Sequence, residues 1–179
     1  MTNDLPQRVS ELNEKARQCL ENNDLPGALL FFTEALEHLT RPDQAAARAG
    51  ILNNIGHAVN SLGRPEEALA AFGQAADLYA AASDVAAYGW QLANIGSVLR
   101  DRKEHAGAIK MYEQALAALT RAKNETGRAD QLSNLGYSHT RAGNRDQARD
   151  CFLQALNIYE RLDEERKAAL VRRNLSALG

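Results

Sequence analysis

The chain has 179 residues, of which 45% are hydrophobic and 25% are charged, so its composition is that of a folded protein and argues against disorder. Its 21 Lys and Arg residues nearly balance 23 Asp and Glu residues, and the net charge of −2 excludes a general attraction for nucleic acid or an anionic membrane. No apolar stretch approaches the roughly 20 residues of a bilayer span, and the opening residues lack a secretory signal. We therefore predict a cytoplasmic protein with no membrane span and no nucleic-acid partner.

Alanine and aromatic residues recur along the chain with a period of 40 residues, without an insertion or a deletion. Alanine stands at positions 28, 68, 108 and 148 and again at positions 35, 75, 115 and 155. The aromatic residues between these alanines are Phe32, Phe72, Tyr112 and Phe152. Because residues three and four apart lie on one helix face, this stripe predicts the buried face of a helix in the second half of each unit.

A second set of residues recurs in the first half of each unit. Leucine occupies positions 12, 52, 92 and 132, and glycine occupies positions 56, 96 and 136, with Ala16 at the same place in the first unit. Glycine inside a helix costs about 1 kcal/mol relative to alanine. Its recurrence predicts a helix crossing that is too close for a side chain.

These stripes divide the chain into helical hairpins, and the absence of strand signals predicts an all-α protein. In chain order we expect an N-terminal tail at residues 1–7, hairpins at 8–42, 43–82, 83–122 and 123–162, and a C-terminal helix at 163–179. Arg172 replaces the recurring leucine in the last helix, which predicts a capping helix whose outer face meets water.

Several residues are expected to mark the helix ends. Gly63 and Gly143 follow the first helices of their units, where a left-handed residue commonly ends a helix. Asp24 and Asn144 precede second helices and are expected to cap them through their side-chain oxygens.

The order of leucine, an aliphatic residue and glycine, followed by alanine, an aromatic residue and alanine, resembles the tetratricopeptide repeat. That family usually has a period of 34 residues. The longer form found here, with Asn54-Ile55-Gly56 and its equivalents, is similar to the repeats of kinesin light chains, spindle-orientation adaptors and bacterial peptide sensors. The resemblance implies a right-handed α-solenoid of four hairpins plus a capping helix, with first helices lining a concave groove that binds peptides or partner helices.

The side of each first helix opposite to the leucine and glycine positions is expected to face this groove. The candidate peptide-binding residues on that side are Asn54, His57, Trp90, Asn94, Arg100, Asn134, Tyr137, Arg141 and Asn174.

One asparagine in this set recurs at positions 54, 94, 134 and 174, and we call these four residues the asparagine ladder. A carboxamide both donates and accepts hydrogen bonds, so the ladder could grip the backbone of an extended peptide. Alternatively, each asparagine bonds to the neighbouring repeat and fixes the stacking angle. The sequence leaves both roles open.

Trp90 and Tyr137 are the candidate anchors for a ligand, because large rigid aromatic side chains dominate interface energetics. For Trp90, the alternative is packing between the third unit and the second. Arg100, Arg141 and Arg173 could attract an acidic segment through charge-assisted hydrogen bonds. Asp101 and Asp130, expected nearby, argue against such a preference.

No catalytic constellation accompanies the groove. The four histidines are scattered over different units, and Cys19 and Cys151 occupy apolar positions, where they are expected to be small core residues. We therefore predict a scaffold that is not an enzyme and has no cofactor or metal, and that binds a peptide or helical segment of a partner protein. The alternative is a self-assembling homo-oligomer, in which one molecule's groove receives part of another.

Overall fold

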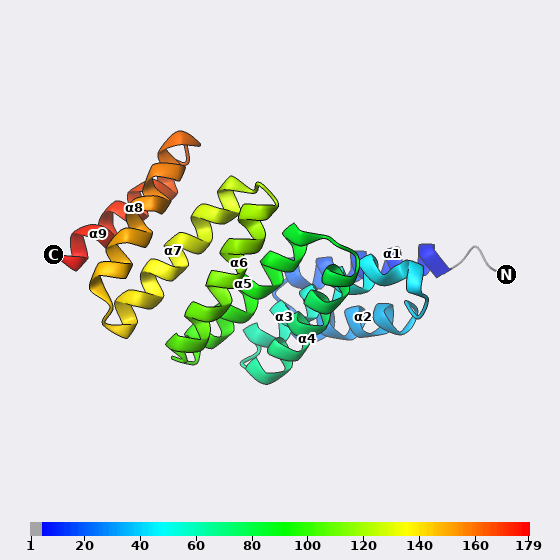
Figure 1. The fold of residues 1–179 in the computed structure, drawn as a ribbon. Coiled ribbons are helices and arrows are strands. Elements are labelled where there is room, and N and C mark those ends of the chain that lie inside the picture. Colours follow the sequence, from blue (N-terminus) through cyan, green and yellow to red (C-terminus); the bar gives the residue numbers. More distant parts are fainter. Residues whose placement is uncertain (1–4) are drawn as a thin grey trace. The chain divides into compact units, whose positions relative to one another are not determined.

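The computed structural model describes residues 5–179, and over this range the chain forms nine α-helices, one short 3-10 turn and no strand (Figure 1). This confirms the predicted all-α fold. Helix α1 begins at Leu5, inside the segment expected as a tail, and the rest of that tail, residues 1–4, lies outside the described residues. In chain order, the elements are α1 (Leu5–Glu21), α2 (Leu25–Glu37), the 3-10 turn η1 (Pro42–Gln44), α3 (Ala45–Ser61), α4 (Pro65–Ala81), α5 (Val85–Asp101), α6 (His105–Arg121), α7 (Glu125–Ala142), α8 (Arg145–Arg161) and α9 (Glu165–Leu178).

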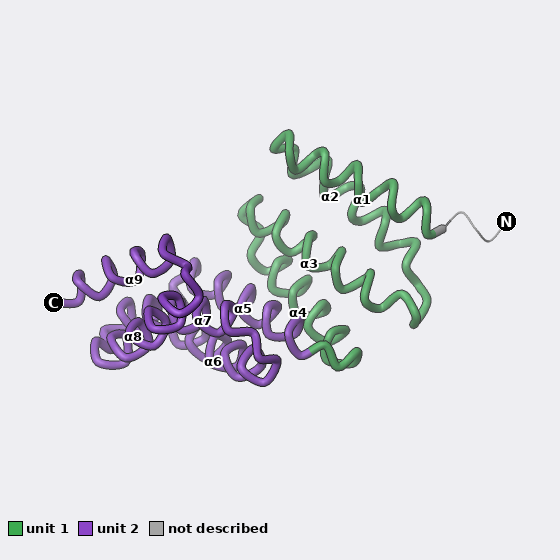
Figure 2. Tube along the Cα trace, turned by 90° about the horizontal axis from the view of Figure 1, so that it is seen from above, with its two compact units in different colours: residues 1–84 green, residues 85–179 purple. Residues whose placement is uncertain are grey.

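The chain divides into two compact units, residues 1–84 and residues 85–179 (Figure 2). In unit 1, α1 packs on α2, α2 on α3, and α3 on α4. In unit 2, consecutive helices from α5 to α9 pack on one another, and α7 also contacts both α5 and α9. Unit 2 therefore has a layer of first helices, α5, α7 and α9, beside a layer formed by α6 and α8. The packing separates the chain at one place, between residues 84 and 85. The boundaries of the individual hairpins expected from the sequence therefore stay a prediction.

Most helices are joined by turns of two or three residues that share one conformation. The turn residues with positive φ, between 55° and 83°, are Asn23, Gly63, Ser83, Lys103, Lys123, Gly143 and Asp163. In each turn the next N–H donates to the carbonyl five residues earlier, as Asn124 does to Leu119 over 2.9 Å, which is the bond of a Schellman motif. The left-handed conformation expected at the two glycines is confirmed, and five other residues adopt it as well.

The two sequence stripes meet between the helices of each hairpin. The alanine and aromatic positions of the second helices are buried, with Phe32, Phe72, Tyr112 and Phe152 no more than 2% exposed. A Cβ added to Gly56, Gly96 or Gly136 would lie 2.6, 2.8 or 2.6 Å from the aromatic ring of the same hairpin. The predicted close crossing is therefore confirmed, and the ring of the second helix is what occupies the space beside the glycine.

The helix caps agree with only part of the prediction. Asp24 Oδ1 accepts a hydrogen bond from the N–H of Gly27 over 2.9 Å, as expected for a cap. The prediction for Asn144 is wrong, because its side chain makes no capping bond to α8. A Cβ on Gly27 would lie 2.0 Å from an oxygen of Asp24, so the Asp24 side chain occupies the space that this glycine leaves open.

Across residues 5–179, no helix combines the length and the apolar character that crossing a bilayer requires.

Candidate functional site

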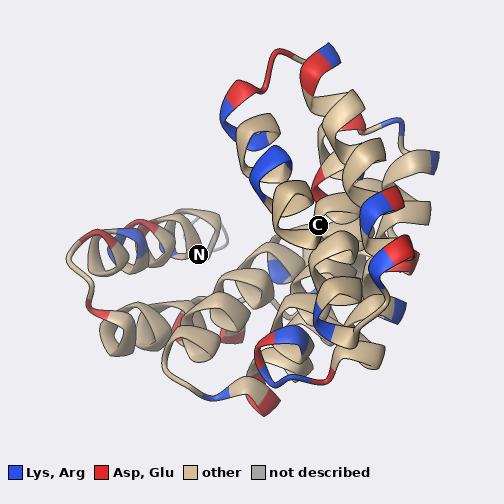
Figure 3. Ribbon diagram, turned by 90° about the vertical axis from the view of Figure 1, so that its left-hand side faces the viewer, with Lys and Arg blue, Asp and Glu red and all other residues tan. Residues whose placement is uncertain are grey.

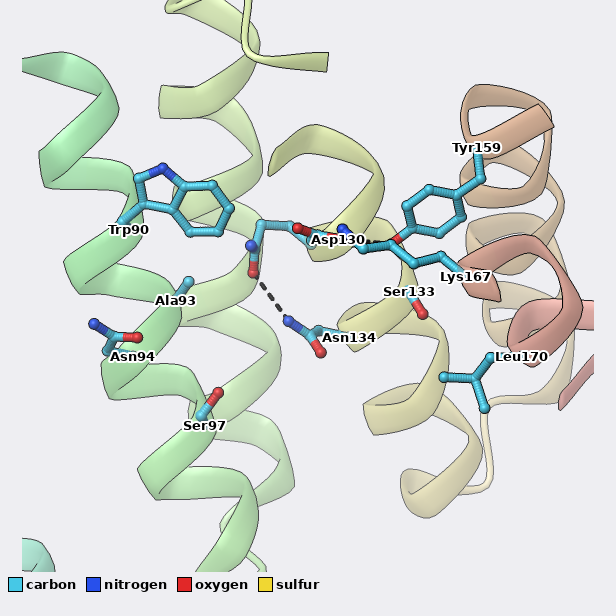
Figure 4. Close-up of a pocket in the computed structure, with 11 residues that line it drawn as sticks. Trp90, Ala93, Asn94, Ser97, Asp130, Ser133, Asn134, Tyr159, Lys167 and Leu170 are labelled. Carbon is cyan, nitrogen blue, oxygen red and sulfur yellow. Dashed lines mark hydrogen bonds and ion pairs between the residues drawn. The ribbon is translucent and has the colours of Figure 1, made fainter. Parts of the chain in front are cut away.

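Helices α5, α7 and α9 surround a pocket of about 390 Å³ in unit 2, which we call the amide pocket (Figure 4). The pocket brings together three residues that the sequence singled out: Trp90 and Asn94 from α5, and Asn134 from α7. Its remaining lining residues are Ala93, Ser97, Asp130, Gln131, Ser133, Tyr159, Lys167 and Leu170.

Trp90 is half-buried at one side of the amide pocket. A Cβ on Gly127 would lie 2.9 Å from the indole Cζ2, so the ring packs directly over the backbone of α7. The alternatives of a groove residue and a packing residue are thus not exclusive for Trp90, since the ring contacts α7 and also lines the pocket.

The asparagine ladder is not held in one uniform way. Asn134 Nδ2 donates to Gln131 Oε1 over 3.2 Å, within α7, as the dashed line in Figure 4 marks. Asn54 Oδ1 accepts a 3.4 Å bond from its neighbour Asn53 in α3. Asn174 is half-buried on α9 and does not line the amide pocket. Each of these two bonds lies within the asparagine's own helix, α7 for Asn134 and α3 for Asn54. Neither is the bond to a neighbouring repeat that the sequence suggested.

Asp130 joins α7 to the two helices that follow it. Its Oδ1 accepts a hydrogen bond from the Tyr159 hydroxyl over 2.7 Å and another from Lys167 Nζ over 2.9 Å. The Lys167 ammonium also lies 5.5 Å from the centre of the Tyr159 ring. Burial, and then the bond to Asp130, raises the pKa of Tyr159 well above its ordinary value. This cluster closes one end of the amide pocket.

Sequence reasoning missed Tyr159 and Lys167 as pocket residues. Lys167 has no equivalent in the earlier units, where positions 47, 87 and 127 are alanine, alanine and glycine, so the repeat gave no signal for it.

Three further predicted residues line a second depression of about 280 Å³ in unit 2, which we call the cationic pocket. They are Arg100, Tyr137 and Arg141. The Arg100 guanidinium carbon lies 5.9 Å from the centre of the Tyr137 ring, and Nε and Nη2 donate to Asp101 Oδ1 over 3.0 and 2.9 Å. The pocket is completed by Asp101, Lys103 and His105.

His57 lies in unit 1 with Asn54. Its ring meets Phe72 edge to face, with centroids 5.0 Å apart and an angle of 72° between the planes. Burial lowers the pKa of His57 below its ordinary value, so the neutral ring is favoured. Its contact is therefore to a core aromatic residue of its own hairpin.

Charged residues of both signs are interspersed along the helices and their turns (Figure 3). Several form pairs between helices, such as Arg161 with Glu125 at 2.7 Å and Arg8 with Glu34 at 2.6 Å. Exposed pairs of this kind contribute little to stability, because water and salt screen both charges.

Residues 5–179 contain no group of three or more His, Cys, Asp or Glu side chains placed to hold a metal ion. Both cysteines are half-buried free thiols, and each packs against an apolar core cluster. Burial and nearby carboxylates, Asp24 for Cys19 and Asp150 for Cys151, raise the pKa of both thiols. A raised thiol pKa disfavours the reactive thiolate.

Two family models, both described as the tetratricopeptide repeat, match residues 47–121 and residues 128–162. The chain belongs to the tetratricopeptide repeat family. Tetratricopeptide repeats are in general interaction modules without enzymatic activity, and membership supports a protein–protein interaction scaffold. A search of curated proteins gave no match to the sequence.

Solved structures of tetratricopeptide type share this fold. The chain superposes on BtubC (BKLC) from P. vanneervenii with a TM-score of 0.79 and 17% identity, covering 97% of this chain and 82% of that one. It superposes on the apo form of RapI with a TM-score of 0.88 and 13% identity, covering 96% of this chain. The chain spans about half of RapI, 48% of its length.

Proposed function

We propose that the chain is a non-enzymatic scaffold that binds a peptide or helical segment of a partner protein along α5, α7 and α9 of unit 2. The observation that carries this proposal is the amide pocket, where Trp90, Asn94 and Asn134 line one depression of about 390 Å³.

The side chains of the amide pocket suit a peptide ligand. The indole of Trp90 supplies a rigid apolar surface and one N–H donor, and aromatic residues of this kind dominate interface energetics. Ser97, Ser133 and Asn94 supply further hydroxyl and amide groups beside it. A peptide backbone offers alternating donors and acceptors, which amides and hydroxyls can match without selecting one side chain.

A peptide library displayed on phage, selected against the whole chain, tests this proposal. A selected peptide should shift the backbone amide NMR signals of α5, α7 and α9, and a scrambled version should not. Shifts confined to the second helices α6 and α8, or no peptide selected at all, would contradict it.

Self-assembly remains the second candidate, and one observation in unit 1 favours it. Leu30 is 65% exposed and, with Pro26, Leu29 and Leu62, lines an apolar depression of about 530 Å³. Exposed apolar surface of this kind often marks an interaction site. Light scattering over a range of concentrations decides this point, because self-assembly predicts a mass that rises above 19.6 kDa while the proposed scaffold alone does not.

A further inference from the structure

The cationic pocket gathers positive charge from three separate elements of unit 2. Arg100 comes from the last turn of α5, Lys103 from the turn between α5 and α6, and Arg141 from the last turn of α7. One acidic residue, Asp101, also lines the pocket. Three cations and one carboxylate leave the pocket with two positive charges in excess.

The cations have donors that the protein itself does not use. A guanidinium has five N–H donors, and Arg100 gives two to Asp101 Oδ1. The side chains of Lys103 and Arg141 make no hydrogen bond or ion pair within residues 5–179. His105 Nδ1 is buried and likewise lacks a hydrogen-bond partner there.

The Arg100 side chain is held in place between Asp101 and the ring of Tyr137. Lys103 has a φ of 65°, and its N–H donates to the carbonyl of Arg100 over 2.9 Å, so the turn fixes its backbone but not its exposed side chain. A preorganised donor such as Arg100 binds an anion better than a mobile one, because less side-chain entropy is lost.

We propose that the cationic pocket binds a phosphoryl group carried by a segment of a partner protein. A phosphorylated side chain has a charge of about −1.5 to −2 at neutral pH and three acceptor oxygens, which matches the excess of two positive charges. A carboxylate carries one negative charge and leaves the pocket half neutralised. Arginine adds specificity, because its planar fork can bind two phosphoryl oxygens at once.

This inference rests on the proposed function, since the phosphoryl group is carried by the ligand of the amide pocket. Ser97 and Asn134 line the amide pocket, while Arg100 and Tyr137, each three residues further along the same helix, line the cationic pocket. Three residues of α-helix rise by about 4.5 Å, so a segment in one pocket can reach the other.

The test titrates the whole chain with three small probes at constant ionic strength: inorganic phosphate, N-acetyl-phosphoserine amide and N-acetyl-glutamate amide. Backbone amide signals of Lys103 and His105 report binding by NMR. Arg141→Gln removes one cation of the pocket, and Arg166→Gln, on an exposed position of α9 outside both pockets, is its control with the same change in charge.

We expect phosphoserine amide to bind at least about tenfold more tightly than the glutamate probe, and Arg141→Gln to weaken it by about tenfold, the cost of one charge-assisted bond. Arg166→Gln should leave the affinity within about twofold, because distant exposed charges are screened. Equal weakening by both variants, equal affinity for the glutamate probe, or binding of inorganic phosphate without phosphoserine amide would overturn the proposal.

The probes contain no partner sequence, so the two proposals fail separately. Phosphoserine amide that shifts Lys103 and His105, together with selected peptides that leave α5, α7 and α9 unshifted, supports the phosphoryl site and removes the proposed peptide groove. Peptides that bind the amide pocket while phosphoserine amide shows no saturable shift remove the phosphoryl site alone.

Discussion

Asn134 is tied to the stability of its own helix before any ligand is present. Its amide donates to Oε1 of Gln131, a side chain that is 1% exposed. A buried acceptor that loses its donor costs about 1 to 3 kcal/mol, more than the net gain from the bond itself. The residue therefore serves packing in α7 and lines the amide pocket at the same time.

Asn134→Ala should lower the free energy of unfolding by about 1 to 2 kcal/mol, because Gln131 Oε1 is left buried and unsatisfied. Urea denaturation followed by circular dichroism measures the change. Asn157→Ala is the matched control, since Asn157 is exposed on α8, and it should change the stability by less than about 0.5 kcal/mol. Two variants of equal stability would show that the Asn134 bond has no structural role.

The stability of the chain should depend on pH through Tyr159, because burial and the bond to Asp130 raise the pKa of its phenol. The neutral phenol is favoured in the folded state, so its stabilisation is fully present below the unfolded pKa of about 10 and is lost as the pH rises above that value. Tyr159→Phe should be less stable than the parent at pH 8, where it lacks the bond to Asp130. The difference in melting temperature should shrink by pH 11, because the phenylalanine variant has no phenol to ionise. If the two melting temperatures differ by the same amount at pH 8 and pH 11, the raised pKa of Tyr159 is contradicted.

At the scale of the elements, each of the last three hairpins is set by an aromatic ring lying on a glycine, and the first hairpin has Ala16 at the glycine position. A Cβ on Gly96 would lie 2.8 Å from the ring of Tyr112, a distance that real Cβ contacts essentially never show. Gly73 in α4 is the opposite case, since a Cβ there meets nothing within 4 Å. The two helical glycines thus differ in surroundings although both carry the same intrinsic helix penalty.

Gly96→Leu should destabilise the chain by about 1 to 3 kcal/mol or more through overpacking against α6. Gly73→Ala should stabilise it by about 0.5 to 1 kcal/mol, because alanine is the better helix former and meets no obstacle. Thermal melts of both variants against the parent measure these opposite shifts. If Gly96→Leu melts like the parent, the close crossing of α5 and α6 is wrong.

The helices and their buried faces follow from the sequence, because spacings of three and four residues place apolar side chains on one face of a helix whatever their partners are. Leu52 in α3 and Phe72 in α4 each lie on the buried face of their own helix. Contacts that depend on the reach of a side chain do not follow. Lys167 on α9 meets Asp130 on α7, and the Asn144 side chain makes no capping bond to α8 although its residue type and position suit one. Five turn residues other than glycine adopt positive φ, which only the recurrence of the turns could have suggested.

The candidate site followed from the sequence only in part. Helix geometry placed Trp90, Asn94 and Asn134 on one side of their helices, and all three line the amide pocket. Helix geometry could not show that Arg100 and Arg141 share a separate pocket with Lys103. Lys103 lies in a turn, and the sequence does not indicate in which direction that turn presents its side chain.

At the scale of the whole molecule, the two proposed sites and the apolar depression fall in different units. Both the amide pocket and the cationic pocket lie within residues 85–179, and the depression around Leu30 lies within residues 1–84. A ligand of unit 2 and an apolar contact of unit 1 can therefore be tested independently with single substitutions. The proposed peptide-binding site is the amide pocket of unit 2.

Trp90 is the only tryptophan of the chain, so emission excited selectively at tryptophan rather than at the five tyrosines reports on the amide pocket. The most direct measurement is a fluorescence titration with a library-selected peptide, comparing the parent with Asn94→Ala and with Asn157→Ala. We predict a saturable change in Trp90 emission, an affinity at least about tenfold weaker for Asn94→Ala, equivalent to about 1.4 kcal/mol, and an unchanged affinity for Asn157→Ala. Circular dichroism should show the same helix content for all three proteins. A peptide that binds without changing Trp90 emission, or with equal affinity for all three proteins, would contradict the account.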